Sequence, residues 1–165
     1  AFNARNDSHS KKYRYRIHEG PQKSALEYQR AWEWRSRIDE SLIRDAASHL
    51  IGEHDFESFR NTECDADHAV REMFEILVET SLRPPLGRYI DITFHANAYC
   101  RHMCRILAGT LMEVGLGKRA PDSMQDIINA RIRTAAGQTA PAFGLTLMEV
   151  IYPRGPEVNV DTRKI

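Results

Sequence analysis

The sequence predicts an α+β fold in which helices pack on one face of a largely antiparallel sheet. Segments with strand and helix patterns are interspersed along the 165 residues. The clearest pair of neighbouring strands is joined by a short Pro/Gly turn, which indicates an antiparallel hairpin. No segment repeats, and the length suits one domain with a hydrophobic core.

The first element is a strand predicted at 11–18. Its residues alternate in polarity, which is typical of a strand with one buried face. One face carries Tyr13, Tyr15 and Ile17, and the other carries Arg14, Arg16 and His18. The Glu-Gly-Pro sequence at 19–21 ends the strand.

A helix is predicted at 39–51 from an apolar stripe. Asp39 is expected to be its N-cap, and Gly52 stands where the helix should stop. Asp55 is then expected to cap a short turn that buries two phenylalanines.

Two strands at 70–80 and 88–96 are predicted to pair as an antiparallel hairpin across the turn at 83–87. The second strand is expected to place three alternating apolar side chains on one face: Ile90, Ile92 and Phe94.

Two further helices are predicted at 98–114 and 121–131, followed by a last strand at 145–152. The first of these helices has an apolar inner face and is followed by Gly115 and Gly117. The polar tail at 154–165 is expected to lie outside the packed domain.

The formal net charge is zero, with 23 basic and 23 acidic residues. The overall charge therefore does not indicate a nucleic-acid partner. Residues 1–36 nevertheless hold eight Lys/Arg against four acids, an excess that could contact phosphates or form a solvated charged face.

No apolar run approaches the roughly 20 residues that cross a bilayer. Without a signal-peptide pattern, a cytoplasmic location and no membrane partner are expected.

The chain has three cysteines, Cys64, Cys100 and Cys104. An odd number in a domain of this size indicates reduced thiols rather than disulfides. Cys100 and Cys104 share a helix face with His102 nearby, but zinc needs four ligands at suitable spacing. We therefore predict buried thiols and no metal.

Four short motifs follow one another along the chain, and together they span residues 2–153. They are Phe-Asn-Ala-Arg at 2–5 with Lys-Lys-Tyr-Arg-Tyr-Arg at 11–16; Gly-Glu-His-Asp-Phe-Glu-Ser-Phe-Arg at 52–60; 96–99 with 102–105 and 109–115; and Thr-Ala-Pro-Ala-Phe-Gly-Leu at 139–145. In order and spacing, the motifs resemble the C-terminal domain of tRNA pseudouridine synthases of the TruA type.

The resemblance implies an isomerase that converts uridine to pseudouridine in the tRNA anticodon stem-loop, around positions 38 to 40, without a cofactor. It implies that Tyr13 is the aromatic residue beside the target base and that Arg105 is the partner of a catalytic aspartate. In the family that aspartate belongs to a Gly-Arg-Thr-Asp-Ala-Gly motif of the N-terminal domain, which this sequence does not contain. Residues 1–153 are thus expected to be a catalytic and RNA-binding domain whose N-terminal partner domain is missing, so that the chain alone is inactive.

The chemistry explains why these residue types are needed. The reaction breaks a C–N glycosidic bond, turns the uracil over and joins C5 to C1′. The base must leave its stack, and an aromatic ring can replace the lost stacking, worth roughly 1–3 kcal/mol. A carboxylate nucleophile must stay ionised in a partly dry pocket, and a neighbouring arginine opposes the rise of its pKa.

Contacts to tRNA phosphates are expected from the basic residues Arg5, Lys11, Lys12 and Arg14. The third motif adds Asn97, His102 and Met103 as expected substrate-binding residues, whereas the acidic segment 63–67 is not expected to touch phosphates. The resemblance also implies a homodimer. Two alternatives remain open, a non-catalytic RNA-binding module and a structural dimerisation domain.

Overall fold

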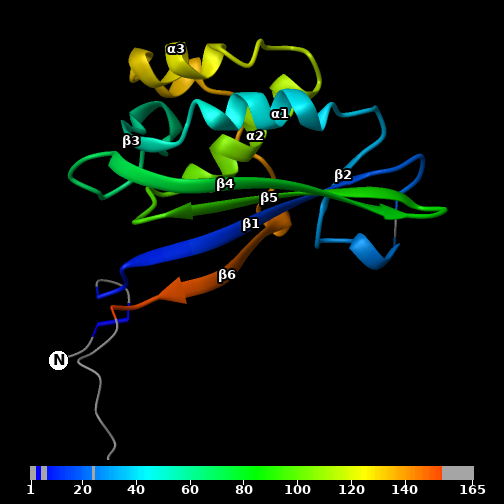
Figure 1. Ribbon diagram of the computed structural model, residues 1–165, viewed down its shortest axis with the longest axis horizontal. Helices are drawn as coiled ribbons and strands as arrows, with labels where there is room; N and C mark the ends of the chain where they lie inside the picture. Colours follow the sequence, from blue (N-terminus) through cyan, green and yellow to red (C-terminus); the bar gives the residue numbers. More distant parts are fainter. Residues whose placement is uncertain (1–2, 5–6, 24, 154–165) are drawn as a thin grey trace, which may run out of the picture.

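The chain folds as a six-stranded sheet with helices on one of its faces (Figure 1). The computed structural model describes residues 3–4, 7–23 and 25–153, so Arg5 and the tail predicted at 154–165 lie outside the described residues. The strands are β1 (Ser10–Glu19), β2 (Trp32–Trp34), β3 (Gly52–Asp55), β4 (Val70–Arg83), β5 (Gly87–Ala96) and β6 (Leu145–Ile151). The described α-helices are α1 (Glu40–Ser48), α2 (Met103–Gly115) and α3 (Ser123–Ala130).

The sheet has the order β2-β1-β5-β4-β3, and β6 pairs with β1 on the same side as β2. Every pairing is antiparallel except that of β1 with β2, which is parallel over three residue pairs. The predicted α+β class, the largely antiparallel sheet and the hairpin of β4 with β5 are therefore confirmed.

The alternation of β1 builds the core under the helices. Antiparallel pairing sets Tyr15 opposite Ile92 and Ile17 opposite Ile90, and all four side chains are fully buried. Each such side chain stabilises the fold by roughly 1.5–3 kcal/mol relative to an exposed position. The same alternation sends Lys12, Arg14 and Arg16 to the opposite face of the sheet, which α1, α2 and α3 do not cover (Figure 1).

Helix α1 begins as predicted, because the Asp39 carboxylate accepts the Ser41 N–H at 2.9 Å. It ends at Ser48, three residues before the predicted end at Ile51. Gly52 instead adopts φ +101° at the start of β3, a conformation that favours glycine. The two shortest strands, β2 and β3, were not predicted, since three or four residues carry too little alternation to be recognised.

Helix α2 begins at Met103, five residues later than predicted. The predicted first turn is instead an irregular loop at 98–102 that ends with His102 in the left-handed region, at φ +62°. The predicted helix at 121–131 and strand at 145–152 correspond to α3 and β6.

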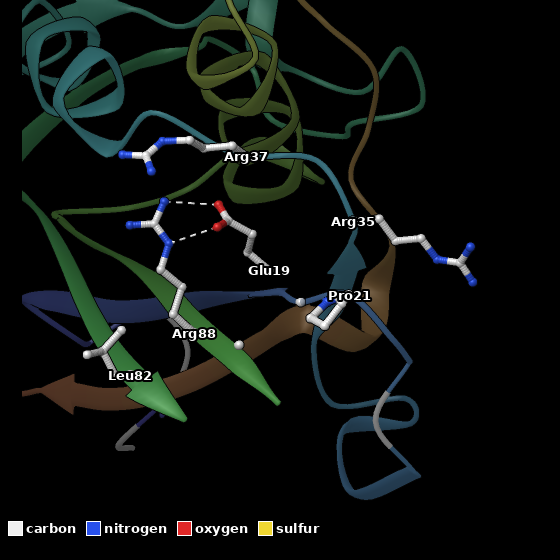
Figure 2. A pocket seen from close by; sticks show the side chains of 8 residues that line it. Glu19, Pro21, Arg35, Arg37, Leu82 and Arg88 are labelled. Carbon is white, nitrogen blue, oxygen red and sulfur yellow. Dashed lines mark hydrogen bonds and ion pairs between the residues drawn. The ribbon is translucent and has the colours of Figure 1, made fainter. Parts of the chain in front are cut away.

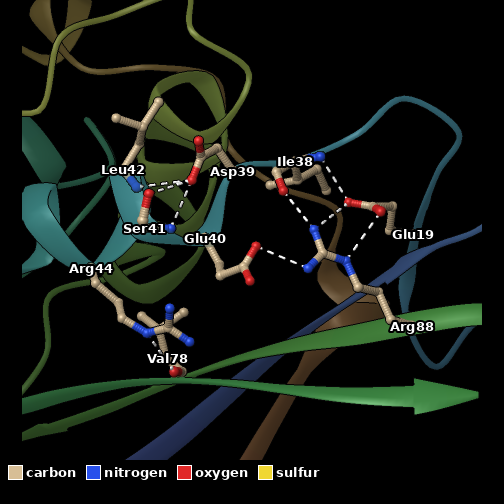
Figure 3. A network of polar contacts seen from close by, with 9 residues as sticks. All are labelled: Glu19, Ile38, Asp39, Glu40, Ser41, Leu42, Arg44, Val78 and Arg88. Carbon is tan, nitrogen blue, oxygen red and sulfur yellow. Dashed lines mark hydrogen bonds and ion pairs between the residues drawn. The ribbon is translucent and has the colours of Figure 1, made fainter.

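One ion-pair network ties α1 to the sheet (Figure 3). The Arg88 guanidinium of β5 donates to both carboxylate oxygens of Glu19 on β1, at 3.1 and 2.9 Å, and to Glu40 of α1 at 2.9 Å. It also donates to the Ile38 carbonyl at 2.6 Å. Hydrogen bonds from its own backbone N–H and from Arg88 lower the pKa of Glu40, which keeps this corner charged at neutral pH.

Candidate active site

A cavity of about 460 Å³ lies where β1, the 98–102 loop and the start of α2 meet. Its lining includes four of the residues singled out in the sequence: Tyr13, His102, Met103 and Arg105. Both predicted catalytic residues thus line one cavity, although 92 positions separate them in the sequence. Met103 is 0% exposed, so its side chain belongs to the core beneath the cavity.

Tyr13 reaches the cavity from β1 and is half-buried. Its ring meets the ring of Tyr99 edge to face, with 5.1 Å between the centroids. The Tyr99 hydroxyl is fixed in turn by the carbonyls of Lys11, at 3.0 Å, and Phe94, at 2.9 Å. Burial raises the pKa of Tyr13, with a smaller contribution from Cys104, so the phenol stays neutral. The result is an aromatic surface held in one orientation.

Arg105 is half-buried on the first turns of α2. Its Nε donates to the Ala140 carbonyl at 2.7 Å, and within the described residues the guanidinium forms no ion pair with a carboxylate. A half-buried guanidinium without an anionic partner is costly. Its charge is available to a ligand or to another segment that enters the cavity.

His102 lines the cavity together with Arg105. The Asn61 side-chain amide nitrogen donates to His102 Nδ1 at 3.2 Å, which requires an unprotonated Nδ1. Burial lowers the pKa of His102, and the charges of Arg105 and Arg101 lower it further. The imidazole is therefore neutral at physiological pH.

Cys64, Asp65 and Ala66 line one side of this cavity, and the segment 61–66 that holds them is called its wall below. The Asn61 N–H donates to the Arg101 carbonyl at 3.1 Å, and the Arg101 N–H donates to Cys64 Sγ at 3.3 Å. The Arg101 guanidinium also donates to the Glu63 carbonyl at 3.1 Å. These bonds fasten the segment to the loop before α2.

The wall brings an aspartate, Asp65, to the cavity. The carboxylate of Asp65 is exposed and lies beyond the 4.0 Å ion-pair distance from Arg105. The arrangement therefore gives Arg105 no direct carboxylate partner from this wall.

A second opening of about 590 Å³ adjoins the first, because Tyr13 and Tyr99 line both. Lys11 and Asn97 contribute to its lining. The side-chain oxygen of Asn97 accepts the N–H groups of Glu72, at 3.1 Å, and Ala98, at 2.7 Å. Asn97 thus shapes the loop that carries Tyr99.

Two predicted phosphate contacts, Lys12 and Arg14, lie on the other face of β1. Lys12 pairs with Glu149 of β6 at 2.9 Å. Arg14 lines a separate cavity of about 380 Å³ and leaves a buried Nε without a hydrogen bond. Of the basic residues predicted to contact phosphates, Lys11 shares the face of Tyr13, and Arg5 lies outside the described residues.

Another cavity, of about 570 Å³, lies at the far end of β1 (Figure 2). Arg88 on its floor is already paired with Glu19. Arg35 and Arg37 point in opposite directions there and do not converge on one anion. The arginine side chains of this cavity are therefore not arranged to bind a phosphate group.

Sequence reasoning missed three contributors to the candidate active site. Tyr99, expected inside a helix, orients Tyr13; Arg101 lies at the rim with a side chain 51% exposed; and Cys64 faces the cavity from the wall. Tyr99 and Arg101 were missed because the segment 98–102 was predicted as the first turn of a helix, whereas it is a loop. No local pattern indicated that Cys64 reaches the cavity. Among the described residues, no group of three metal-ligating side chains is found, and no helix is long and apolar enough to cross a bilayer.

These features define an α+β domain with a cavity lined by an aromatic ring and by an arginine that has no carboxylate partner among the residues described. The family model described as "tRNA pseudouridine synthase" matches residues 46–153, a range that includes Arg105 and ends after β6. The chain belongs to this family.

Curated relatives agree with that assignment. The tRNA pseudouridine synthase A of Geotalea uraniireducens is 40% identical over 152 residues, which cover 92% of this chain and 60% of the relative. The protein of the same name from Myxococcus xanthus is 40% identical over 155 residues, covering 94% of this chain and 57% of the relative. The chain spans about three fifths of the length of the curated relatives it matches.

Proposed function

We propose that this chain supplies the aromatic and arginine half of a site that isomerises uridine to pseudouridine in tRNA. The observation that carries the proposal is the pairing of Tyr13 with Arg105 in one cavity, where Arg105 has no ion pair within the described residues. The carboxylate nucleophile comes from a separate N-terminal domain of the same family. The target uridines are those of the anticodon stem-loop, and the active assembly is a homodimer.

In this proposal Tyr13 stacks on the uracil after it leaves the helix of the tRNA. Arg105 pairs with the incoming aspartate and keeps it ionised against the rise in pKa that burial causes. The nucleophile takes part in breaking the glycosidic bond, and the rotated base re-forms a bond through C5. No redox step is involved, and the reaction needs no cofactor.

The test compares the purified chain with the chain mixed with an N-terminal domain of a relative. Joining C5 to C1′ releases the C5 hydrogen, so tRNA with tritium at C5 of uridine reports turnover directly. We expect no tritium release by the chain alone and release in the mixture. Turnover by the isolated chain would contradict the proposal that the nucleophile is supplied elsewhere.

Asp65 lines the cavity, so its substitution tests whether an aspartate of this chain could itself be the nucleophile. Asp65→Asn in the mixture should leave turnover within about twofold, as expected for an exposed side chain without an assigned partner. Loss of turnover in this variant would identify Asp65 as the nucleophile. Salt-sensitive tRNA binding without turnover in every mixture would instead support a non-catalytic RNA-binding module.

A further inference from the structure

We propose that Cys64 is an oxidant-sensitive thiol in the wall of the candidate active site and that Cys100 converts its oxidised form into a disulfide. Peroxides are the class of oxidant. The bond would tie the 61–66 wall to the loop that precedes α2. Its effect on RNA rests on the proposed function, whereas the thiol chemistry does not.

The fold brings the two cysteines to the same cavity. Both cysteines line it and both are free thiols. The Arg101 N–H donates to Cys64 Sγ at 3.3 Å, and Arg101 directly follows Cys100, so the two cysteines belong to neighbouring segments at the cavity. Cys64 is half-buried, whereas Cys100 is only 4% exposed. This is the arrangement of an attacking thiol with a resolving partner.

The surroundings distinguish the two thiols chemically. Burial opposes ionisation of Cys64, but hydrogen bonds from the backbone of Arg101 and Ala66, the charge of Arg60 and the Cys100 thiol together lower its pKa. Burial raises the pKa of Cys100. Because the thiolate is the reactive form, oxidation begins at Cys64.

Cys104 provides an internal comparison. It also lines the cavity, but burial raises its pKa well above the ordinary value, so it stays a thiol. A buried thiol of this kind is inert towards oxidants. Oxidation should therefore select one pair among the three cysteines.

The chemical steps balance with one peroxide. The Cys64 thiolate attacks hydrogen peroxide, an S–O bond forms, the O–O bond breaks, and the departing hydroxide is protonated to water. Cys100 then attacks the sulfenic sulfur, an S–S bond forms, and the second hydroxide leaves with the Cys100 proton as water. Two thiols are oxidised to one disulfide while one peroxide is reduced to two waters.

The test treats the purified chain with hydrogen peroxide, alkylates the remaining thiols with iodoacetamide and maps the peptides by mass spectrometry. We expect a Cys64–Cys100 disulfide and an alkylated Cys104. Without peroxide, iodoacetamide should modify Cys64 at least roughly tenfold faster than Cys104. Equal reactivity of the three thiols, or a disulfide that includes Cys104, would overturn the proposal.

Two serine variants separate the roles. Cys100→Ser should stop at a Cys64 sulfenic acid that a cyclic 1,3-diketone traps, and Cys64→Ser should leave Cys100 reduced. Trapping at Cys100 in the second variant would contradict the assigned order. Should either variant fail to fold, the peptide map of the unmodified chain still decides the outcome.

A final arm repeats the oxidation with excess tRNA. Slower disulfide formation is expected if RNA occupies the cavity. Disulfide formation at an unchanged rate would support the thiol proposal and count against the proposed function, so the two can fail separately.

Discussion

Arg105 and Ala140 are joined twice: the Ala140 N–H donates to the Arg105 carbonyl at 3.0 Å, and Arg105 Nε donates to the Ala140 carbonyl at 2.7 Å. The next residue, Pro141, accepts the Tyr15 hydroxyl at 2.8 Å. The 140–141 segment is thus held between α2 and β1, and it fixes the direction of the guanidinium.

The planar guanidinium of Arg105 can hold a carboxylate at two points, which a lysine ammonium cannot do. In the proposed mixture of this chain with an N-terminal domain of a relative, Arg105→Lys keeps the charge but loses the fork that holds a carboxylate at two points. We expect turnover to fall roughly a hundredfold from mispositioning, while tRNA affinity changes less than about threefold. Single-turnover kinetics and filter binding measure the two quantities. An equal loss of both would assign Arg105 to RNA binding.

His102 reports on the charge of Arg105 in the chain alone. Because burial, Arg105 and Arg101 lower its pKa, His102 should titrate below 6.5 in the folded chain. Arg105→Gln removes one of these charges and should raise the pKa of His102, as measured by NMR of the imidazole protons. Arg133→Gln, which alters an arginine bound to Gly137 and Thr139, should leave it unchanged.

The lowered pKa of His102 also makes the free energy of unfolding depend on pH. The unfolded chain binds a proton at this histidine more readily than the folded chain does. The contribution of His102 is therefore complete above the unfolded value of 6.5 and is lost as the pH falls through 6.5 towards its lower folded pKa. Urea titrations above and below this window should show the decrease, and His102→Asn should make it smaller.

Substitution of Tyr13 separates stacking from hydrogen bonding. Tyr13→Phe keeps the ring and its contact with Tyr99, so tRNA binding should be retained. Tyr13→Ala removes a stacking surface worth roughly 1–3 kcal/mol, which corresponds to a loss of about 5-fold to 150-fold in affinity. A collapse of binding in Tyr13→Phe would rule out the stacking role.

Lys11 and Lys12 form a matched pair, since they carry the same charge on opposite faces of β1. Lys11 lines the opening beside Tyr13, and Lys12 pairs with Glu149. Lys11→Gln should weaken tRNA binding more than Lys12→Gln and reduce the salt dependence by about one counterion. Equal effects, measured by filter binding over a salt series, would mean that tRNA contacts both faces.

Gly109 permits the 137–140 segment to approach α2. A Cβ there would lie 1.9 Å from the Gln138 carbonyl oxygen, so the backbone must move. We expect Gly109→Ala to reduce the free energy of unfolding by roughly 3 kcal/mol. In Gly117→Ala the added methyl meets open space at φ +70°, and a smaller loss of about 1 kcal/mol is expected. Denaturant titrations compare the two.

The sequence predicted a helix or strand correctly where apolar residues recur with the period of that element. The alternation of Tyr13, Tyr15 and Ile17 predicted β1, and the hairpin of β4 with β5 followed from apolar residues flanking a Pro/Gly turn. The same alternation implied that Lys12 and Arg14 point away from Tyr13. The prediction that Arg5, Lys11, Lys12 and Arg14 all contact phosphates did not take these opposite directions into account.

The rest depended on contacts between distant residues. The start of α2 was predicted too early because Ala98 and Tyr99 suit a helix, whereas the Tyr99 hydroxyl bonds to carbonyls on β1 and β5. No local pattern could show that Arg105 bonds to Ala140, 35 positions away. Nor could it show that the 61–66 segment closes the cavity.

The bond from Arg105 Nε to Ala140 also limits the approach of a carboxylate. A guanidinium can hold a carboxylate side-on, through Nε and one terminal nitrogen, or end-on, through both terminal nitrogens. The Ala140 carbonyl already occupies the side-on edge. An anion held at two points must therefore come in along the axis of the side chain, and Arg105 selects its partner by direction as well as by charge.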